Sequence, residues 1–346
     1  SSSGLYSMFM SLASESVPMA KRNLVVLLIS SIFLLAQGVM AVLAIPVVPL
    51  RFSHHLPALG IYWNSWRTLV IVYSLPSIVQ SLLLDSTEKN EEKSSAKDQI
   101  VPLFKMPLLK YTIIMILLFA FQQIGSFLVW LPTILNQFIT NIETGEGTNL
   151  TVCGVLRLGI ENPIEPDPDA VPCAINETAL LMLLAVGVMK SVVNSLLSLI
   201  VNKVGRRNLV MMISALCGIC GILVNLVPNA YGSIVLFGIF SVGIIVLGFY
   251  TAIIVALFPT HLRALAIALP LTCGRLAVFA GIQILNVLLT INCDVGFYVF
   301  ATIYASSAIV ASFLPDDRKL VPTVAPSEDK ELTQKEEMPQ RSMTEL

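Results

Sequence analysis

The sequence predicts an all-α membrane protein with about eight transmembrane helices. Of its 346 residues, 55% are hydrophobic and 12% are charged, whereas a soluble domain usually carries about 25% charged residues. Long uncharged runs account for this composition, and each has about the 20 residues that a membrane-crossing helix needs. Such runs are too long for barrel strands, and lipid leaves open backbone groups unsatisfied. Helices are therefore the spanning form that we expect.

Turn residues divide the apolar runs into separate spans. The longest uncharged stretch, residues 208–262, contains Pro228, Asn229 and Gly232, which predict a tight turn between two helices. In chain order, the predicted spans cover residues 24–50, 62–84, 111–137, 179–202, 208–227, 231–257, 264–290 and 296–314.

The charges in the loops predict the orientation of the spans. Residues 85–110 contain five lysines, whereas residues 138–178 contain one basic residue, Arg157, and seven acidic ones. Because basic residues favour the cytosolic side, we expect the first loop in the cytosol and the second outside it. Alternation of the spans then places both termini of this chain in the cytosol.

The predicted outer loop also contains modification signals. Asn149 and Asn176 each begin a glycosylation sequon, which is modified only on the lumenal or extracellular side. Cys153 and Cys173 lie in the same loop and form a disulfide in an oxidising compartment, or remain free thiols. Spacing alone leaves both alternatives open.

A short repeat links two regions at the predicted cytosolic side. Residues 15–22 align without gaps onto residues 256–263. Pro18 coincides with Pro259, and Arg22 coincides with Arg263. A second basic element, residues 202–207, forms a very short turn in which Gly205 permits the reversal of the chain.

These elements together resemble the major facilitator superfamily, in particular the branch that contains organic-ion carriers and synaptic vesicle glycoprotein 2. The resemblance rests on the Gly-Arg-Arg turn at residues 205–207, on residues 258–263, on residues 274–276 and on the Leu-Pro-Asp-Asp sequence at residues 314–317. It implies a partial fold in which the eight spans match helices five to twelve of a twelve-helix carrier. The chain, which starts at a serine, is then expected to lack the N-terminal helices.

The resemblance also implies four parts and a transport mechanism. Residues 1–84 are expected to be a remnant of the N-terminal bundle, comprising the end of one helix and two spans, and residues 85–110 a cytosolic linker. Residues 111–314 would form the C-terminal six-helix bundle with the outer loop 138–178, and residues 315–346 a disordered cytosolic tail. Such carriers bind their substrate near the midplane, between two bundles that rock against each other.

The resemblance also implies a cytosolic gate. Family members commonly have an acidic residue at the positions of Asn202 and Ala256, and this sequence has neither, although it keeps Glu15. We therefore expect a weakened gate in the second bundle. The residues of the expected gate motif are Asn202, Gly205, Arg206, Arg207, Pro259, Arg263, Glu15 and Arg22.

Ionisable and polar side chains inside the spans are the candidates for a substrate cavity. Lys190 and Arg275 are the ionisable side chains deep within predicted helices, and such residues are functional candidates by default. No acidic residue occurs between Ala179 and Cys293, so an anionic or neutral solute fits better than a cation. For the polar residues, hydrogen bonding between helices is the competing interpretation. The candidates are Lys190, Asn194, Arg275, Gln122, Gln123, Asn286 and Tyr250.

The leading hypothesis is therefore a transporter of a small organic solute that works by alternating access in the plasma membrane or a vesicle membrane. One alternative is a transporter-like membrane glycoprotein that binds a protein partner through its outer loop or its tail. Another is a truncated product without transport activity. No nucleophile with a base, phosphate-binding loop, metal site, cofactor site or nucleic-acid-binding patch is recognisable, which argues against an enzyme.

Overall fold

The structure is a computed structural model. It describes residues 2–47, 50, 52–56, 60–87, 101–124, 134, 151–161 and 177–315. Residues 1–314 belong to one compact unit, and residues 315–346, the predicted tail, form a second unit that lies almost wholly outside the described residues.

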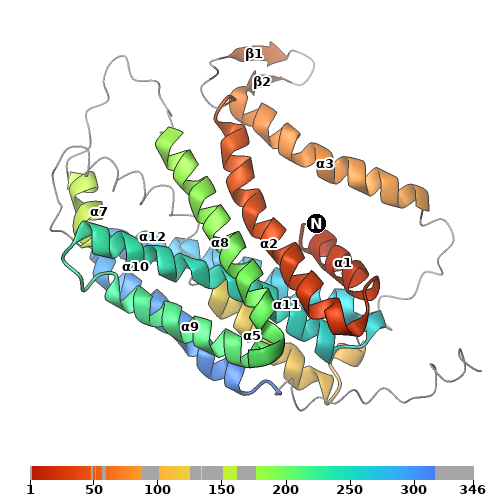
Figure 1. The fold of residues 1–346 in the computed structure, drawn as a ribbon. Coiled ribbons are helices and arrows are strands. Elements are labelled where there is room, and N and C mark those ends of the chain that lie inside the picture. The colour runs from red at the N-terminus through yellow and green to blue at the C-terminus, as the bar shows by residue number, and fades with distance from the viewer. Residues whose placement is uncertain are drawn as a thin grey trace, which may run out of the picture. The chain divides into compact units, whose positions relative to one another are not determined.

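The described part of the first unit is helical apart from one β-hairpin (Figure 1). The elements are α1 (Ser2–Glu15), α2 (Met19–Ala44), β1 (Ser53–Leu56), β2 (Ile61–Asn64), α3 (Ser65–Thr87), α5 (Leu108–Ile124), α7 (Val152–Glu161), α8 (Glu177–Val204), α9 (Arg206–Leu223), α10 (Ala230–Val242), the 3₁₀-helix η2 (Gly243–Ile245), α11 (Val246–Leu257) and α12 (Thr260–Ser312).

Six segments of the described chain are long and apolar enough to cross a membrane. They are Lys21–Ala44, Leu180–Val204, Arg206–Leu223, Tyr231–Leu257, Thr260–Leu288 and Ile291–Ser312. These six match six of the eight predicted spans, which supports an integral, multi-pass protein. Of the other two, the predicted span at 111–137 is described at residues 111–124 and at residue 134, and α5 is a shorter apolar helix.

The remaining predicted span, residues 62–84, begins differently from our expectation. Ile61–Asn64 is a strand that pairs antiparallel with Ser53–Leu56, so that helix α3 starts only at Ser65. Gly60, between the two strands, has a positive φ of 62°, a conformation that glycine adopts without steric cost. The aromatic residues Tyr62 and Trp63 suit a strand, and pairing with Ser53–Leu56 places them in one.

Local chemistry accounts for the boundaries between the later helices. Gly205 has φ 88° and separates α8 from α9, which confirms the predicted glycine reversal. Asn229 caps α10, because its side-chain oxygen accepts hydrogen bonds from the backbone N–H groups of Tyr231 and Gly232. The predicted turn near residue 228 is thereby confirmed. Within α12, Asn292 departs from helical geometry and divides the last two spans.

Two helix pairs organise the packing of the described chain. Helix α2 lies along α8, and helix α5 packs against α12, which also contacts α1 and α9. In Figure 1, α2 and α8 run side by side although about 150 residues separate them in the chain. Small residues permit this approach: a Cβ on Gly38 would come within 2.9 Å of the Cα of Leu184 on α8.

Candidate functional site

A cavity of about 110 Å³ lies between the first two helices and the later ones. Helices α1 and α2 form one part of its wall, and α5, η2, α11 and α12 form the rest. Its volume is comparable to that of cavities that admit a small organic molecule or a few waters. The lining residues are Tyr6, Ser30, Phe33, Leu34, Gln37, Phe119, Gln123, Ile244, Ile245, Leu247, Gly248, Thr251, Leu271 and Arg275.

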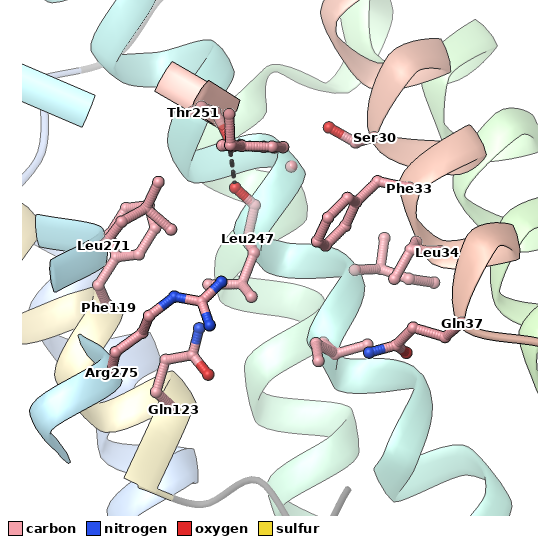
Figure 2. Close-up of a pocket in the computed structure, with 14 residues that line it drawn as sticks. Ser30, Phe33, Leu34, Gln37, Phe119, Gln123, Leu247, Thr251, Leu271 and Arg275 are labelled. Atoms are coloured by element: carbon pink, nitrogen blue, oxygen red, sulfur yellow. Dashed lines mark hydrogen bonds between the residues drawn. The ribbon is translucent and has the colours of Figure 1, made fainter. Parts of the chain in front are cut away.

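One part of the cavity wall is polar and positively charged. Arg275 lies near the middle of the apolar segment Thr260–Leu288 of α12. Figure 2 shows its guanidinium next to the amide of Gln123 from α5, while Gln37 projects into the cavity from α2. Among the described residues that line the cavity, Arg275 is the charged one.

The rest of the wall is aromatic and aliphatic. The rings of Tyr6 and Phe33 have their centroids 5.3 Å apart, and Phe119 lies on the other side with Leu271 (Figure 2). The hydroxyl of Tyr6 is 3.5 Å from that of Thr251, which itself donates a 2.6 Å hydrogen bond to the carbonyl of Leu247. A cavity with a charged end and apolar walls fits an amphipathic organic molecule.

Two of the predicted cavity residues, Arg275 and Gln123, line this cavity. Lys190 and Asn194 are not among its lining residues. Asn194 donates 2.8 Å hydrogen bonds to the carbonyl of Leu27 and to Oγ of Ser31, which matches the competing interpretation of hydrogen bonding between helices. Lys190 is 2% exposed on the same face of α8, with no hydrogen bond or ion pair to another described residue.

The other three candidates also lie outside the lining of the cavity. Gln122 is buried and donates a 3.1 Å hydrogen bond to the carbonyl of Gly243. Tyr250 is completely buried, and its ring packs 5.4 Å from that of Phe119, behind the cavity wall. Asn286 is exposed on α12. These side chains point away from the cavity because of the orientation of each helix about its own axis. The sequence alone does not reveal that orientation.

The contribution of α2 is one part of the cavity that we did not predict. Ser30, Phe33 and Gln37 recur at helical spacing and share one face of this helix. Gln37, an amide deep within the apolar segment Lys21–Ala44, was the available signal.

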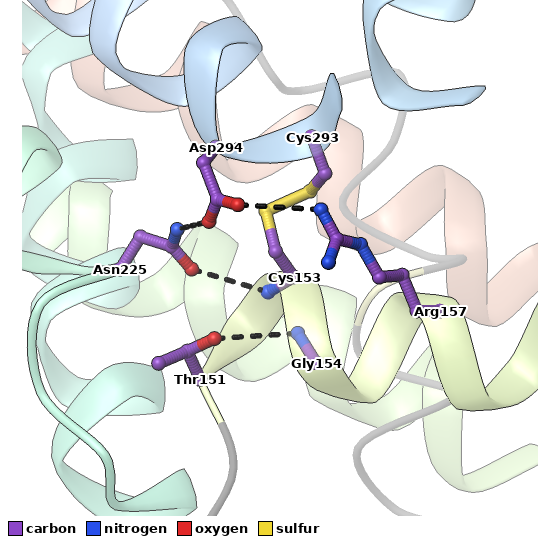
Figure 3. The surroundings of a disulfide bond; sticks show 7 residues. All are labelled: Thr151, Cys153, Gly154, Arg157, Asn225, Cys293 and Asp294. Carbon is purple, nitrogen blue, oxygen red and sulfur yellow. Dashed lines mark hydrogen bonds and ion pairs between the residues drawn. A yellow bond between two sulfur atoms is a disulfide. The ribbon is translucent and has the colours of Figure 1, made fainter. Parts of the chain in front are cut away.

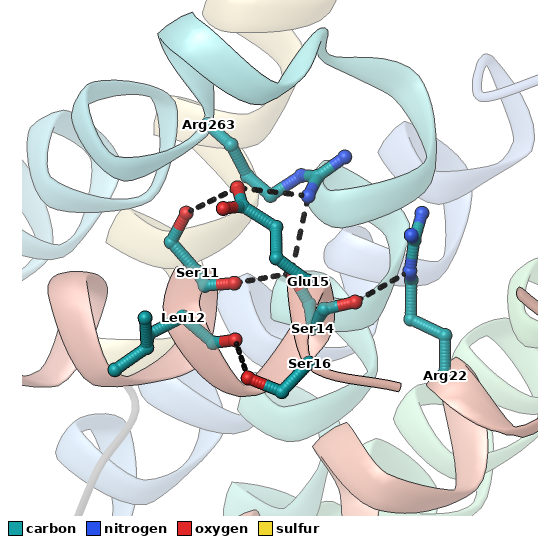
Figure 4. A network of polar contacts seen from close by, with 7 residues as sticks. All are labelled: Ser11, Leu12, Ser14, Glu15, Ser16, Arg22 and Arg263. Carbon is teal, nitrogen blue, oxygen red and sulfur yellow. Dashed lines mark hydrogen bonds and ion pairs between the residues drawn. The ribbon is translucent and has the colours of Figure 1, made fainter. Parts of the chain in front are cut away.

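An ion pair joins distant parts of the predicted gate motif (Figure 4). Nη1 of Arg263 lies 3.4 Å from Oε1 of Glu15 and donates a 3.1 Å hydrogen bond to Oγ of Ser14. The Arg263 side chain is 4% exposed, whereas that of Glu15 is 43% exposed. Arg22 donates to the carbonyl of Ser14 at 2.7 Å. The two copies of the repeat therefore meet at one end of the bundle, which we call the basic end (residues 11–23, 202–207 and 256–263).

Hydrogen bonds to uncharged acceptors complete the basic end. Nδ2 of Asn23 donates to Oδ1 of Asn202 at 3.5 Å, in place of an ion pair with an acid at position 202. Arg206 is buried and donates to the carbonyl of Ala252. Pro259 is the N-cap residue of α12, with an extended backbone conformation.

The opposite end contains a disulfide bond that differs from our expectation. Cys153 pairs with Cys293, which is 140 positions later, and not with Cys173, which lies outside the described residues together with the sequons at Asn149 and Asn176. The bond connects α7 with α12. Sequence proximity suggested the pairing within the loop, but the fold brings α7 to the bend at Asn292.

Polar contacts surround this disulfide (Figure 3). Nη2 of Arg157 is 3.3 Å from Oδ2 of Asp294, and Asn225 donates a hydrogen bond to the same carboxylate. Oδ1 of Asn225 also accepts from the backbone N–H of Cys153 at 3.3 Å. Helix α7, which we did not predict, is thereby attached to two later segments. Its buried residues Val152, Val155 and Leu156 have the spacing of an amphipathic helix.

Neither a model of a known protein family nor a curated protein matches this sequence.

Proposed function

We propose that this membrane protein is a secondary carrier of a small organic solute, and that the solute is an anion in preference to a neutral molecule. The observation that carries the proposal is the position of Arg275, beside the amides of Gln37 and Gln123, in a cavity between α1, α2 and the later helices. A guanidinium in such a place binds carboxylates through paired hydrogen bonds.

The arrangement of the helices supports alternating access. The cavity lies where the first helices meet the later ones, and the ion pair between Glu15 and Arg263 joins these two groups at the basic end. A carrier that exposes its site alternately needs such breakable contacts between its moving parts. The resemblance to the major facilitator superfamily leads to the same proposal, with the basic end as the cytosolic end.

The walls of the cavity define the solute class more closely. The rings of Phe33 and Phe119 and the side chains of Leu34 and Leu271 provide apolar contact, and Gln37 and Gln123 provide amide groups beside Arg275. A solute with one carboxylate and an apolar or aromatic body matches this distribution.

Uptake by the protein in reconstituted vesicles tests the proposal. The panel comprises aromatic monocarboxylates, aliphatic monocarboxylates, sugars and organic cations. We expect uptake of monocarboxylates, which Arg275→Gln reduces about 10- to 100-fold because a hydrogen bond to a charged group contributes about 1.5–3 kcal/mol. Arg275→Lys is expected to retain part of the activity.

Arg157→Gln is the matched control, because Arg157 is an exposed arginine at the disulfide end, away from the cavity. Uptake that prefers cations, or that is equal for wild type and Arg275→Gln, contradicts the proposed role of Arg275. Absence of uptake for every panel member by folded protein contradicts the carrier proposal itself.

A second function, binding of a protein partner at the predicted outer side, is favoured by the attachment of α7. The disulfide and the pair between Arg157 and Asp294 hold this helix in a fixed position with both charged side chains exposed. If a partner binds there, cross-linking on intact cells should capture the same protein with wild type and lose it with Arg157→Glu. Equal capture by both forms contradicts a partner site at α7.

A further inference from the structure

The cavity has a second polar region, formed by three hydroxyl groups from three helices. Tyr6 on α1, Ser30 on α2 and Thr251 on α11 all line the cavity. The hydroxyl of Tyr6 lies within hydrogen-bonding reach of the hydroxyls of Thr251 and Ser30. We call these three residues the hydroxyl end of the cavity.

The arginine end, formed by Arg275, Gln37 and Gln123, lies apart from the hydroxyl end. In Figure 2, Thr251 and Ser30 lie at the top of the cavity, the three residues of the arginine end lie at the bottom, and apolar side chains lie between them. Helix α2 contributes to both ends, and its residues Ser30 and Gln37 are two turns apart, about 10 Å along the helix axis. A solute that fills the cavity therefore meets polar groups at both of its ends.

The hydroxyl end presents oxygen atoms that can accept hydrogen bonds. Thr251 donates its proton to the carbonyl of Leu247 at 2.6 Å. Ser30 donates its proton to the carbonyl of Val26 at 3.0 Å. The proton of Tyr6 is then directed to the hydroxyl oxygen of Thr251, at 3.5 Å, or to that of Ser30. Because each hydroxyl oxygen has two lone pairs, the three oxygens keep acceptor capacity for a bound molecule.

Close packing holds the hydroxyl end in place. A Cβ at Gly248 would come within 2.9 Å of Cβ and Oγ of Ser30, so a glycine at this position permits the approach of α2 to α11. Gly248 and Thr251 are three residues apart and share one face of α11. The ring of Tyr6 packs against that of Phe33, with centroids 5.3 Å apart. The hydroxyl groups are therefore positioned before a solute binds, which lowers the entropic cost of binding.

We propose that the hydroxyl end recognises a hydrogen-bond donor on the solute, so that the preferred solute is an aromatic monocarboxylate with a hydroxyl or N–H group opposite its carboxylate. This inference rests on the proposed function, since the carboxylate is bound by Arg275. The distal O–H or N–H group donates to the hydroxyl oxygen of Ser30 or Thr251. With a hydrogen bond of about 2.8 Å at each end, the remaining separation suits a solute that has one ring between its polar groups.

The hydroxyl end does not suit a second carboxylate. Its three side chains are uncharged, and their protons are used for hydrogen bonds within the protein. A carboxylate there would lose its hydration and face oxygen atoms that do not donate to it. A methoxy group is also a poor match, because its oxygen carries no proton. The arrangement thus distinguishes a hydroxyl group from groups of similar size.

Equilibrium binding to the whole chain in lipid nanodiscs, measured by calorimetry, tests the proposal without requiring transport. The probes are benzoate, 4-hydroxybenzoate, 4-methoxybenzoate and terephthalate at neutral pH. We expect 4-hydroxybenzoate to bind about 3- to 10-fold more tightly than benzoate, the range that one hydrogen bond contributes. The other two probes should bind no more tightly than benzoate. Equal affinities for benzoate and 4-hydroxybenzoate would overturn the proposal, as would 4-methoxybenzoate or terephthalate binding as tightly as 4-hydroxybenzoate.

A double variant tests the two acceptors. Ser30→Ala combined with Thr251→Val removes both hydroxyl oxygens and is expected to lower the affinity for 4-hydroxybenzoate to that for benzoate. Thr272→Val is the matched control, because Thr272 also donates to a carbonyl of its own helix, at 2.8 Å, but is not among the residues that line the cavity. A preference for 4-hydroxybenzoate that persists in the double variant contradicts the proposal. The comparison of probes with the unchanged protein gives its result even if the double variant fails to fold.

Arg275→Gln separates this proposal from the proposed function. We expect this variant to weaken the binding of benzoate and 4-hydroxybenzoate by a similar factor, since both carboxylates use the guanidinium. If benzoate binding depends on Arg275 and the hydroxyl group adds no affinity, the hydroxyl end has no role in recognition but the carboxylate site stands. If neither compound binds to folded protein, both the carboxylate site and this inference are wrong.

Discussion

Glu15 and Arg263 are 248 positions apart in the chain, and Nη1 of Arg263 donates a 3.4 Å hydrogen bond to Oε1 of Glu15. Each residue belongs to one of the two copies of the short repeat at residues 15–22 and 256–263. Because the Arg263 side chain is almost fully buried, it depends on Glu15 and Ser14 for its polar partners at this place. The pair therefore connects α1 to α12.

Neutralising the carboxylate should weaken this connection. We expect Glu15→Gln to weaken the interaction between α1 and α12 at the basic end by about 1 kcal/mol or less, since Glu15 is partly exposed. In a variant without Cys217, Cys220 and Cys273, a cysteine introduced by Thr251→Cys in the cavity wall should then react faster with an impermeant maleimide added at the basic end. Glu15→Asp, which keeps the charge, is the control. An unchanged reaction rate would show that the pair does not restrict access.

Asn194 should matter for stability and not for solute binding. Asn194→Ala removes two hydrogen bonds to α2 and is expected to lower the free energy of unfolding by about 1 kcal/mol, in the range measured for polar contacts between membrane helices. Denaturant titration in detergent measures this change. Ser195→Ala is the control, because Ser195 donates only within its own helix. A selective loss of uptake affinity in Asn194→Ala would instead show that Asn194 contributes to the solute site.

The disulfide pairing is directly testable by peptide mapping. After alkylation without reduction, we expect a linked peptide pair that contains Cys153 and Cys293. Replacing both cysteines by serine should lower the melting temperature, because a crosslink across 140 residues reduces the conformational entropy of the unfolded chain. For a loop of about 100 residues, this effect stabilises the folded state by about 4 to 5 kcal/mol. A linked pair that contains Cys153 and Cys173 would contradict the structure.

The crossing of α2 and α8 should reject a larger side chain. Gly38→Val would place its Cβ 2.9 Å from the backbone of Leu184. We expect overpacking to lower the free energy of unfolding by about 1–3 kcal/mol. Gly238→Val is the control, because a Cβ at Gly238 meets no atom within 4 Å. Melting temperatures in detergent compare the two variants. Equal effects would indicate that helix propensity, and not the close crossing, determines the cost.

Much of the helical framework could be predicted because its signals are local. Six predicted spans, the glycine reversal at Gly205 and the turn before α10 all depend on the residues that form them. The β-hairpin and helix α7 were not predicted, since short segments with mixed polarity acquire their structure from their partners. Cys153 illustrates this dependence: its partner is 140 positions away, and local sequence does not indicate which distant segment reaches it.

The sequence by itself determined the membrane environment, the positions of most helices and the presence of a positive charge, Arg275, within an apolar segment. Only the tertiary structure decided which polar side chains share a cavity. Gln122 and Gln123 are adjacent, yet successive residues of an α-helix differ by about 100° in direction, so that Gln123 lines the cavity while Gln122 bonds to the carbonyl of Gly243 in the interior. The rotation of each helix about its axis results from packing between distant segments, and the local sequence does not specify it.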